Sequence, residues 1–188
     1  MGDYGLYIVL GVVALLFIVL YNRIVALQQA RKNAFSDIDV QLKQRYNLVP
    51  QLVDTVKGYA KHEKELLEKV TNARADAMNT KGFGAAKGEA EGILGGAMMN
   101  LMAVAENYPD LKANSNFEQL QNELSDIENK LAATRRFFNN ATSEYNAGIQ
   151  QFPAVILARL FKFTEEEFFE LDAAEADAVK KAPEIVFS

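Results

Sequence analysis

Cysteine and tryptophan are absent from this 188-residue chain, and histidine occurs once, at His62. The lack of cysteine excludes disulfides and thiolate metal sites, and it leaves the redox compartment open. His62-Glu63 begins like a zinc-binding HExxH motif, but Leu66 stands where the second histidine is required. A catalytic zinc site needs about three protein ligands, and no serine lies in the context of a nucleophile elbow. We therefore predict no catalytic residue, no cofactor and no metal ligand, in a protein that is not an enzyme.

Positively charged residues are fewer than negatively charged ones, with 20 Lys and Arg residues and 25 Asp and Glu residues. No region is basic enough to predict a nucleic-acid partner. Only four prolines occur, and the apolar content is 49%. That composition favours long packed helices and argues against a disordered chain.

Charged residues are missing altogether between Tyr4 and Asn22. A helix over this stretch is about 28 Å long, close to the thickness of the hydrocarbon core of a bilayer, and tyrosines at both ends suit its interfaces. A cleaved signal peptide requires a positive N-terminal region, where this chain has only Asp3, and a buried core helix normally has a polar face. We predict a transmembrane anchor, whose membrane-spanning residues are Leu6, Ile8, Val9, Leu10, Val12, Val13, Leu15, Leu16, Phe17, Ile18, Val19 and Leu20.

The charges that flank this span predict its orientation. Arg23, Arg31, Lys32, Lys43 and Arg45 all follow it, and no Lys or Arg precedes it. Because cationic residues stay on the cytoplasmic side, the N-terminus is expected outside and the rest of the chain in the cytoplasm.

The stretch from Ile38 to Ala77 repeats its seam positions at alternating steps of four and three residues. This pattern is typical of a helix that packs along one seam, as in a coiled coil. Pro50 lies inside the stretch, where proline normally kinks or breaks a helix. Because the pattern keeps its phase on both sides of Pro50, we predict one kinked helix that continues from the anchor to about Asn79.

Six glycines then fall between residues 82 and 96. They predict a flexible hairpin, and the alternative is a helix thin enough for close backbone approach. A second helix is predicted from Ala85 or Glu89 to Glu106, stopped by Pro109.

A third helix is predicted to begin at the sequence Ser115-Asn116-Phe117-Glu118, which reads as a capping box. Its seam runs from Phe117 to Phe152 with the same alternation, so we expect it to pair with the first helix. Polar residues inside the two seams are expected to pair between helices and to set their register: Arg45, Glu63, Glu128 and Arg135.

A shorter fourth helix is predicted from residue 154 to 179, followed by an irregular tail over 180–188. Its apolar start, together with Arg159 and Lys162, suits either the closing of the bundle end or a helix on the membrane surface. The predicted helix lengths place residue 153 far from the membrane, which favours a bundle-closing role or contact with a neighbouring chain. The predicted domains are an N-terminal tail with the anchor (1–22), a helical stalk (23–50), a helical bundle (51–179) and the tail (180–188).

The same lengths leave the stalk without a partner in its own chain, because the second helix returns less than half the length of the first. An exposed apolar seam usually marks an interface. We therefore predict that the stalk pairs with the stalks of other copies, through an oligomer interface of Leu27, Ala34, Ile38 and Leu42.

Four stretches of the chain resemble the bacterial LemA family: residues 37–77, 103–124 and 134–146, and the Phe152-Pro153 pair. The segments RYNLVPQLV and YPDLKAN are the most specific, and the stretch 82–96 and the acidic tail are the least typical. The resemblance implies a short single-pass protein of the bacterial inner membrane with a soluble bundle of long helices, and it implies no catalytic residues. The matching positions, which we interpret as structural or interface residues, are Asp39, Arg45, Tyr46, Asn47, Pro50, His62, Glu63, Pro109, Asn114, Arg135, Arg136, Phe152 and Pro153.

Together these features predict an all-α fold in which an N-terminal transmembrane helix continues into a long-helix antiparallel bundle, similar to a LemA four-helix bundle. The leading functional hypothesis is a self-associating scaffold whose partners are the lipid bilayer and other copies of the chain. The alternative is an adaptor or regulator of another membrane protein, such as a membrane protease.

Overall fold

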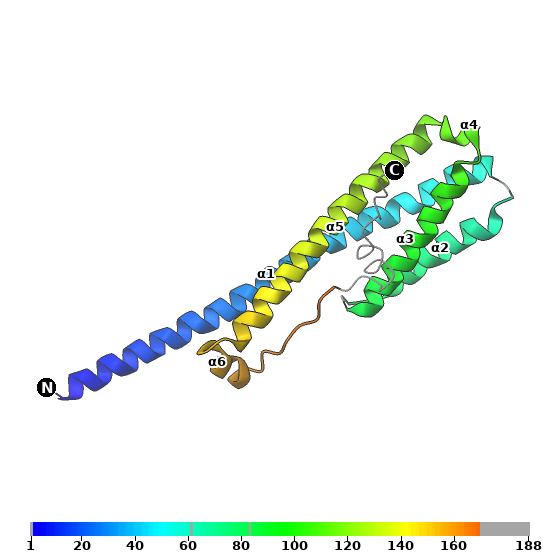
Figure 1. The fold of residues 1–188 in the computed structure, drawn as a ribbon. Helices are drawn as coiled ribbons and strands as arrows, with labels where there is room; N and C mark the ends of the chain where they lie inside the picture. Colours follow the sequence, from blue (N-terminus) through cyan, green and yellow to red (C-terminus); the bar gives the residue numbers. More distant parts are fainter. Residues whose placement is uncertain (1, 61, 83, 170–188) are drawn as a thin grey trace, which may run out of the picture. The chain divides into compact units, whose positions relative to one another are not determined.

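A computed structural model describes residues 2–60, 62–82 and 84–169 of the chain. Every regular element in this part is a helix, which confirms the predicted all-α fold (Figure 1). The described residues form two compact units: residues 2–38 with 134–167 make the first unit, and residues 39–133 with 168–169 make the second. The helices are α1 (Gly2–Tyr59), α2 (Lys64–Asn79), α3 (Ala85–Ala105), α4 (Pro109–Lys112), α5 (Ser115–Gln150) and α6 (Ala154–Leu160).

The second unit is an antiparallel bundle of the end of α1, α2, α3 and the start of α5. Arg74 on α2 donates a 2.7 Å hydrogen bond to the carbonyl of Tyr46 on α1, so α2 returns along α1. Asn114, just before α5, donates a 2.9 Å bond to the Tyr59 hydroxyl at the end of α1. The apolar stripes of these helices meet in a core that includes Leu52, Val56, Val70, Ala77, Leu94, Leu101, Leu120, Leu124, Ile127 and Leu131.

The predicted continuous helix to Asn79 is wrong, because α1 ends at Tyr59 and α2 begins at Lys64. Pro50 lies inside α1 without ending it, as expected. Gly58 lowers the helix propensity near the break, and Tyr59 is exposed where the seam required a buried residue. Two antiparallel helices that face one core each keep an apolar stripe, so the phase of the pattern did not reveal the turn between them.

The first unit pairs the start of α1 with the end of α5 and with α6. The Phe35 ring lies 6.1 Å from the Phe138 ring, and Arg31 bonds Thr142. Ile24 packs in one core cluster with Tyr145 and Ile149. As residue numbers fall along α1 they rise along α5, so the two segments are antiparallel.

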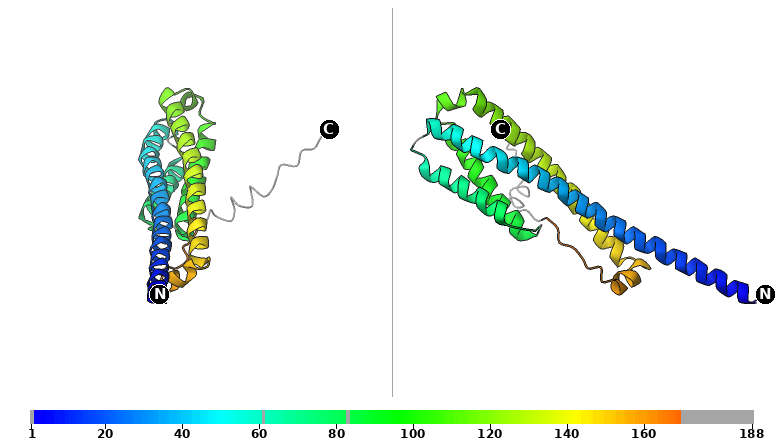
Figure 2. Two further views of the ribbon diagram at one scale, coloured as in Figure 1. Left: turned by 90° about the vertical axis from the view of Figure 1, so that its left-hand side faces the viewer. Right: turned by 180° about the vertical axis from the view of Figure 1, so that it is seen from behind.

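Residue 153 lies close to the apolar span of α1, whereas the predicted helix lengths place it far from the membrane. The chain breaks between Tyr59 and Lys64, and within the first unit α5 runs antiparallel to the start of α1. Ala154, Leu157 and Ala158 of α6 pack against Ile24, beside Leu20 and Leu27. Residue 153 is thus near the base of the apolar span, and Figure 2 shows α6 folded against α1.

Two further predictions about helix ends are corrected. Asn114, and not Ser115, caps α5, because its Oδ1 accepts hydrogen bonds from the amides of Asn116 (2.9 Å) and Phe117 (3.1 Å). The fourth helix is short: α6 ends at Leu160, and residues 163–169 have no helical structure. The predicted helix beyond residue 169 and the tail 180–188 lie outside the described residues. The second helix matches its prediction, since α3 begins at Ala85 and ends at Ala105.

Candidate functional site

The apolar start of α1 is the first candidate functional surface. It is the one helix, among those described, that is long and apolar enough to cross a membrane, and its most apolar stretch has a mean hydropathy of 2.5. None of that stretch is buried inside the protein. The large apolar side chains from Leu6 to Val19 are between 43% and 69% exposed, and Leu20 is the predicted spanning residue that packs partly against the core. Such a surface is unfavourable in water and suits the hydrocarbon core of a bilayer.

A cluster of aromatic residues surrounds the point where this surface ends. The Tyr21 ring meets the Phe161 ring edge-on at 5.0 Å and lies 6.1 Å from the Phe163 ring. Phe163 also packs against the core cluster that contains Ile24 and Leu157. The base of the apolar span is therefore bound to the end of the α5–α6 segment.

The predicted oligomer interface on the stalk is covered by the chain itself. Ala34, Ile38 and Leu42 are at most 1% exposed, and Leu27 packs beside the core cluster of the first unit. The prediction assumed that no helix returned along the stalk, but α5 is long enough to do so. The premise of an uncovered stalk seam is thus wrong, and these four residues act as core positions.

Arg31 links α1 to a segment without helical structure, residues 164–167, which we call the strap. Its Nη2 donates a 3.0 Å bond to the Glu167 carbonyl, and its Nη1 lies 3.1 Å from Glu166 Oε2. Its Nε donates a 3.1 Å bond to Thr142 Oγ1 on α5. Burial lowers the pKa of the Arg31 guanidinium, opposed by the charge of Glu166. The side chain amide of Asn146 adds two 2.9 Å bonds, to the backbone amide and the carbonyl of Glu166.

A buried polar cluster lies in the core of the second unit. Glu91 on α3 has a fully buried side chain, and its Oε2 lies 3.1 Å from Arg45 Nη1. Its Oε1 accepts a hydrogen bond from the Tyr46 hydroxyl and lies 3.3 Å from Lys87 Nζ. Arg45 Nε also lies 2.8 Å from Glu128 Oε1 on α5, so the predicted pairing of Arg45 with the third seam is confirmed.

The cluster is a structural network of ion pairs and hydrogen bonds between helices. Lys87 Nζ donates to the Tyr46 hydroxyl (2.9 Å) and to the Ala77 carbonyl (2.5 Å), so it ties α3 to α1 and α2. Burial raises the pKa of Tyr46, and the hydrogen bond and charge of Glu91 raise it further. Because both Glu91 oxygens already face protein donors, the cluster specifies which helices meet and leaves this carboxylate no free oxygen for a ligand.

Sequence reasoning missed Lys87 and Glu91. They lie in the glycine-rich stretch, which was predicted as a hairpin or a thin helix, and the helix alternative is the observed one. A Cβ on Gly95 would stand 3.1 Å from Arg45 Nη2, so this glycine permits the close approach of the guanidinium. The signal was present in the sequence, since Lys87 and Glu91 are oppositely charged residues four positions apart in a largely apolar segment.

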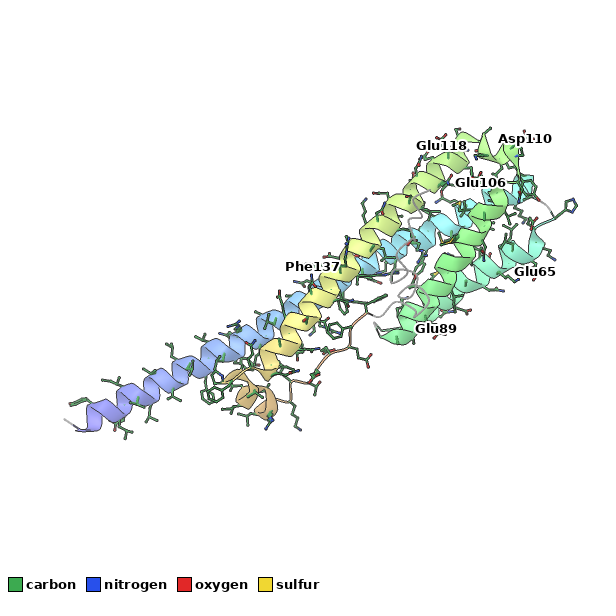
Figure 3. The ribbon with its side chains drawn as sticks, in the orientation of Figure 1. Glu65, Glu89, Glu106, Asp110, Glu118 and Phe137 are labelled. Atoms are coloured by element: carbon green, nitrogen blue, oxygen red, sulfur yellow. The ribbon has the colours of Figure 1, made fainter. Side chains whose placement is uncertain are left out.

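Other acidic residues lie on the outside of the second unit. Figure 3 labels Glu65, Glu89, Glu106, Asp110 and Glu118 on its outer helix surfaces. Among the described residues, no three His, Asp or Glu side chains gather as a metal site requires. Glu65 bonds Lys69 at 2.8 Å, which lowers the pKa of the Glu65 carboxyl. These are solvated helix faces of the ordinary kind.

The fold and the exposed span together define an all-helical protein with one N-terminal helix suited to cross a membrane. The LemA family pattern matches residues 34–187, and the chain belongs to the LemA family.

Relatives of known name show the same relationship. The chain is 26% identical to magnetosome protein MamQ of Magnetospirillum gryphiswaldense, over 79% of this chain and 64% of that protein. It therefore spans slightly less than two thirds of the length of this relative. It is 26% identical to magnetosome protein MamQ 2 of Paramagnetospirillum magneticum, over 86% of this chain and 70% of the relative. It is also 26% identical to protein LemA of Metamycoplasma hominis, over 88% of this chain and 80% of that protein.

Proposed function

We propose that this protein is a single-pass membrane anchor carrying a rigid helical bundle, and that it acts without catalysis as a self-associating scaffold. The observation that carries the anchor is the uncovered apolar surface from Leu6 to Val19. Because α1 continues without interruption to Tyr59, the anchor and the bundle share one helix. A helix that belongs to both the anchor and the bundle suits a structural role.

The orientation in this proposal is cytoplasmic, at the bacterial inner membrane. It is supported by the cationic residues, which all follow the span. Arg31 and Arg45 are themselves buried and ion-paired, so the surface charge near the membrane comes from Arg23 and Lys32, both exposed.

The self-association surface in this proposal is the outward face of α3. From Gly92 onward this helix has apolar side chains on more than one side: Leu94 and Leu101 face the core, while Ile93 and Met99 are 57% and 71% exposed. A helix of this kind is normally buried on every side. A groove beside it is lined by residues of α2 and α3, including Leu66, Ala73, Ile93, Gly96 and Ala97. A second copy that lays an apolar helix into this groove would cover the face.

The test is the particle mass of the full-length protein in native lipid, without any added partner. We expect a large discrete assembly for the unchanged chain and a smaller particle for Ile93→Glu. The matched control is Val40→Glu, which places the same charge on an exposed apolar position of α1 in the same unit and should keep the assembly.

A monomer of the unchanged chain would overturn self-association. The exposed face of α3 would then fit the alternative function, an adaptor that binds another membrane protein, and cross-linking from position 93 in membranes would identify that protein. An assembly that survives Ile93→Glu but not Val40→Glu would place the interface on α1.

A further inference from the structure

Helix α6 presents a second uncovered apolar surface, which the anchor does not include. Phe152, Ile156, Leu160 and Phe161 are 81%, 52%, 67% and 53% exposed, and we call these four residues the α6 patch. The opposite side of α6 is filled, since Ala154, Leu157 and Ala158 are buried in the core of the first unit. Apolar side chains thus lie on both sides of α6, and those of the α6 patch are more than half exposed within the described chain.

The α6 patch lies at the level where the apolar span ends. Phe161 is in ring contact with Tyr21, and Tyr21 is the last aromatic residue of the uncharged stretch. If residues 4–22 cross the bilayer, Phe161 must therefore be near the lipid headgroups. The acidic strap lies further from the lipid headgroups than Phe161 does. Its partner Arg31 follows Tyr21 by ten residues, or about 15 Å of helix.

Two exposed cations, Arg159 and Lys162, accompany the patch. Lys162 has a left-handed backbone with φ of 59°, and it follows the end of α6. The Phe163 amide bonds the Ala158 carbonyl (2.9 Å) and the Lys162 amide bonds the Arg159 carbonyl (3.4 Å), which is the pattern of a Schellman cap. That position usually holds glycine, because other residues are strained there. Here the chain carries a strained lysine at the level of the headgroups, and strained residues cluster at functional positions.

We propose that the α6 patch is a second membrane contact, lying flat in the interface of the bilayer that the anchor crosses. Its apolar side chains enter the boundary of the acyl chains, and Arg159 and Lys162 pair with the phosphates of anionic lipids. The inference rests on the proposed anchoring of residues 4–22. Two contacts on one leaflet would fix the tilt and rotation of the first unit, which a single helix cannot do.

The absence of tryptophan makes a direct test possible, because one introduced tryptophan is then the only one in the full-length protein. Leu160→Trp places the reporter in the α6 patch, and Leu10→Trp places it in the span. The matched control is Phe137→Trp, since Phe137 is exposed on α5 in the same unit but fifteen residues before Phe152 (Figure 3). Each variant is reconstituted into vesicles whose phosphatidylcholine carries brominated acyl chains, which quench tryptophan on contact.

We expect both Leu10→Trp and Leu160→Trp to lose most of their emission in brominated vesicles, and Phe137→Trp to keep it. Quenching of Leu10→Trp without Leu160→Trp would overturn the membrane contact of α6 and leave the anchor intact. A blue-shifted Leu160→Trp that is not quenched would mean that protein covers the patch, which also overturns the inference. Absence of quenching in Leu10→Trp would overturn the anchor itself, and the inference with it.

The charges are tested separately with Lys162→Gly, combined with Leu160→Trp, in vesicles with and without anionic phosphatidylglycerol. This change removes the cation and also relieves the left-handed strain, so lost folding cannot explain a weaker contact. We expect phosphatidylglycerol to increase the quenching of the parent and to have a smaller effect on the Lys162→Gly chain. An unchanged response to phosphatidylglycerol would overturn the pairing of Lys162 with anionic lipid.

Discussion

Two buried arginines on α1 show how differently the two units are held together. Arg31 and Arg45 are fourteen residues apart, two heptads, so they lie on the same face of the helix. In the second unit, Arg45 meets the fully buried Glu91 of α3. In the first unit, Arg31 meets Glu166, whose side chain is one third exposed, and the carbonyl of Glu167.

The two arginines differ in the kind of segment that each of them contacts. Arg45 joins regular helices, and every contact it makes inside the core constrains which helices pack together. Arg31 instead holds a strap without helical hydrogen bonds, by using a backbone carbonyl and a partly solvated carboxylate. An arginine at the same heptad position therefore determines which helices pack together in one unit and binds an irregular segment in the other.

The largest expected effect comes from removing Glu91. Glu91→Ala leaves the buried charges of Arg45 and Lys87 without their shared carboxylate, so the free energy of unfolding should fall by about 3–5 kcal/mol. Urea unfolding of the full-length protein in detergent, followed by helical circular dichroism, measures this change. Glu89→Ala, an exposed glutamate of the same helix, should stay within about 0.5 kcal/mol. Equal losses in the two variants would contradict a structural role for the cluster.

Removing Arg31 should have a smaller effect. Arg31→Met keeps the apolar stem but loses the bonds to Thr142 and the Glu167 carbonyl, and we expect a loss of about 2 kcal/mol. Glu166 can turn toward water, so no fully buried charge is left behind. The neighbouring Lys32→Met change, at an exposed position, should have little effect in the same unfolding assay. A loss as large as that of Glu91→Ala would remove the contrast between the two arginines.

Alkaline pH should distinguish the two units through their buried tyrosines. Burial and the bond to Glu91 raise the pKa of Tyr46, whereas burial and the more distant charge of Glu166 raise that of Tyr145. A raised pKa means that the folded state holds the proton more tightly. Stability is therefore unaffected well below pH 10 and falls as the pH rises above it, by about 1.4 kcal/mol per pH unit for one such tyrosine.

The matched variants are Tyr46→Phe and Tyr145→Phe, compared with the unchanged chain by urea unfolding from pH 9 upward. Tyr46→Phe should flatten the alkaline loss more than Tyr145→Phe, because only Tyr46 donates directly to a buried carboxylate. The reverse order would mean that the environment of Tyr145 is the more restrictive one.

The smallest expected effect concerns the start of α5. Asn114→Ala removes the side-chain oxygen that accepts two backbone amides, so we expect a loss of about 1 kcal/mol. Ser115→Ala should change the stability by less than about 0.5 kcal/mol, because Ser115 is not the capping residue. Unfolding midpoints of the two variants, measured side by side, decide between the cap predicted from the sequence and the cap in the structure.

Local chemistry let the sequence predict several elements correctly. A helix of about 28 Å without charged residues has a surface that is unfavourable in water. In the structure the apolar side chains from Leu6 to Val19 are exposed. The seam of α5 from Phe117 to Tyr145 is largely buried, and the limits of α3 agree with its flanking glycines and Pro109. The polar residues inside the apolar seams also predicted ion pairs between helices, and Arg45 with Glu128 is one such pair.

Tertiary structure alone decided the direction of the chain after Tyr59. The period of a helix is the same whether the chain continues or turns back, so the apolar pattern could not reveal the turn before Lys64. In the structure Leu27, Ala34, Ile38 and Leu42 of the stalk pack inside their own chain and do not form an exposed seam. Helix α6 packs near the base of the anchor. The amino-acid sequence determined which residues avoid water, because burial depends on side-chain chemistry. Which part of the molecule covers these residues depends on long-range packing, which only the tertiary structure shows.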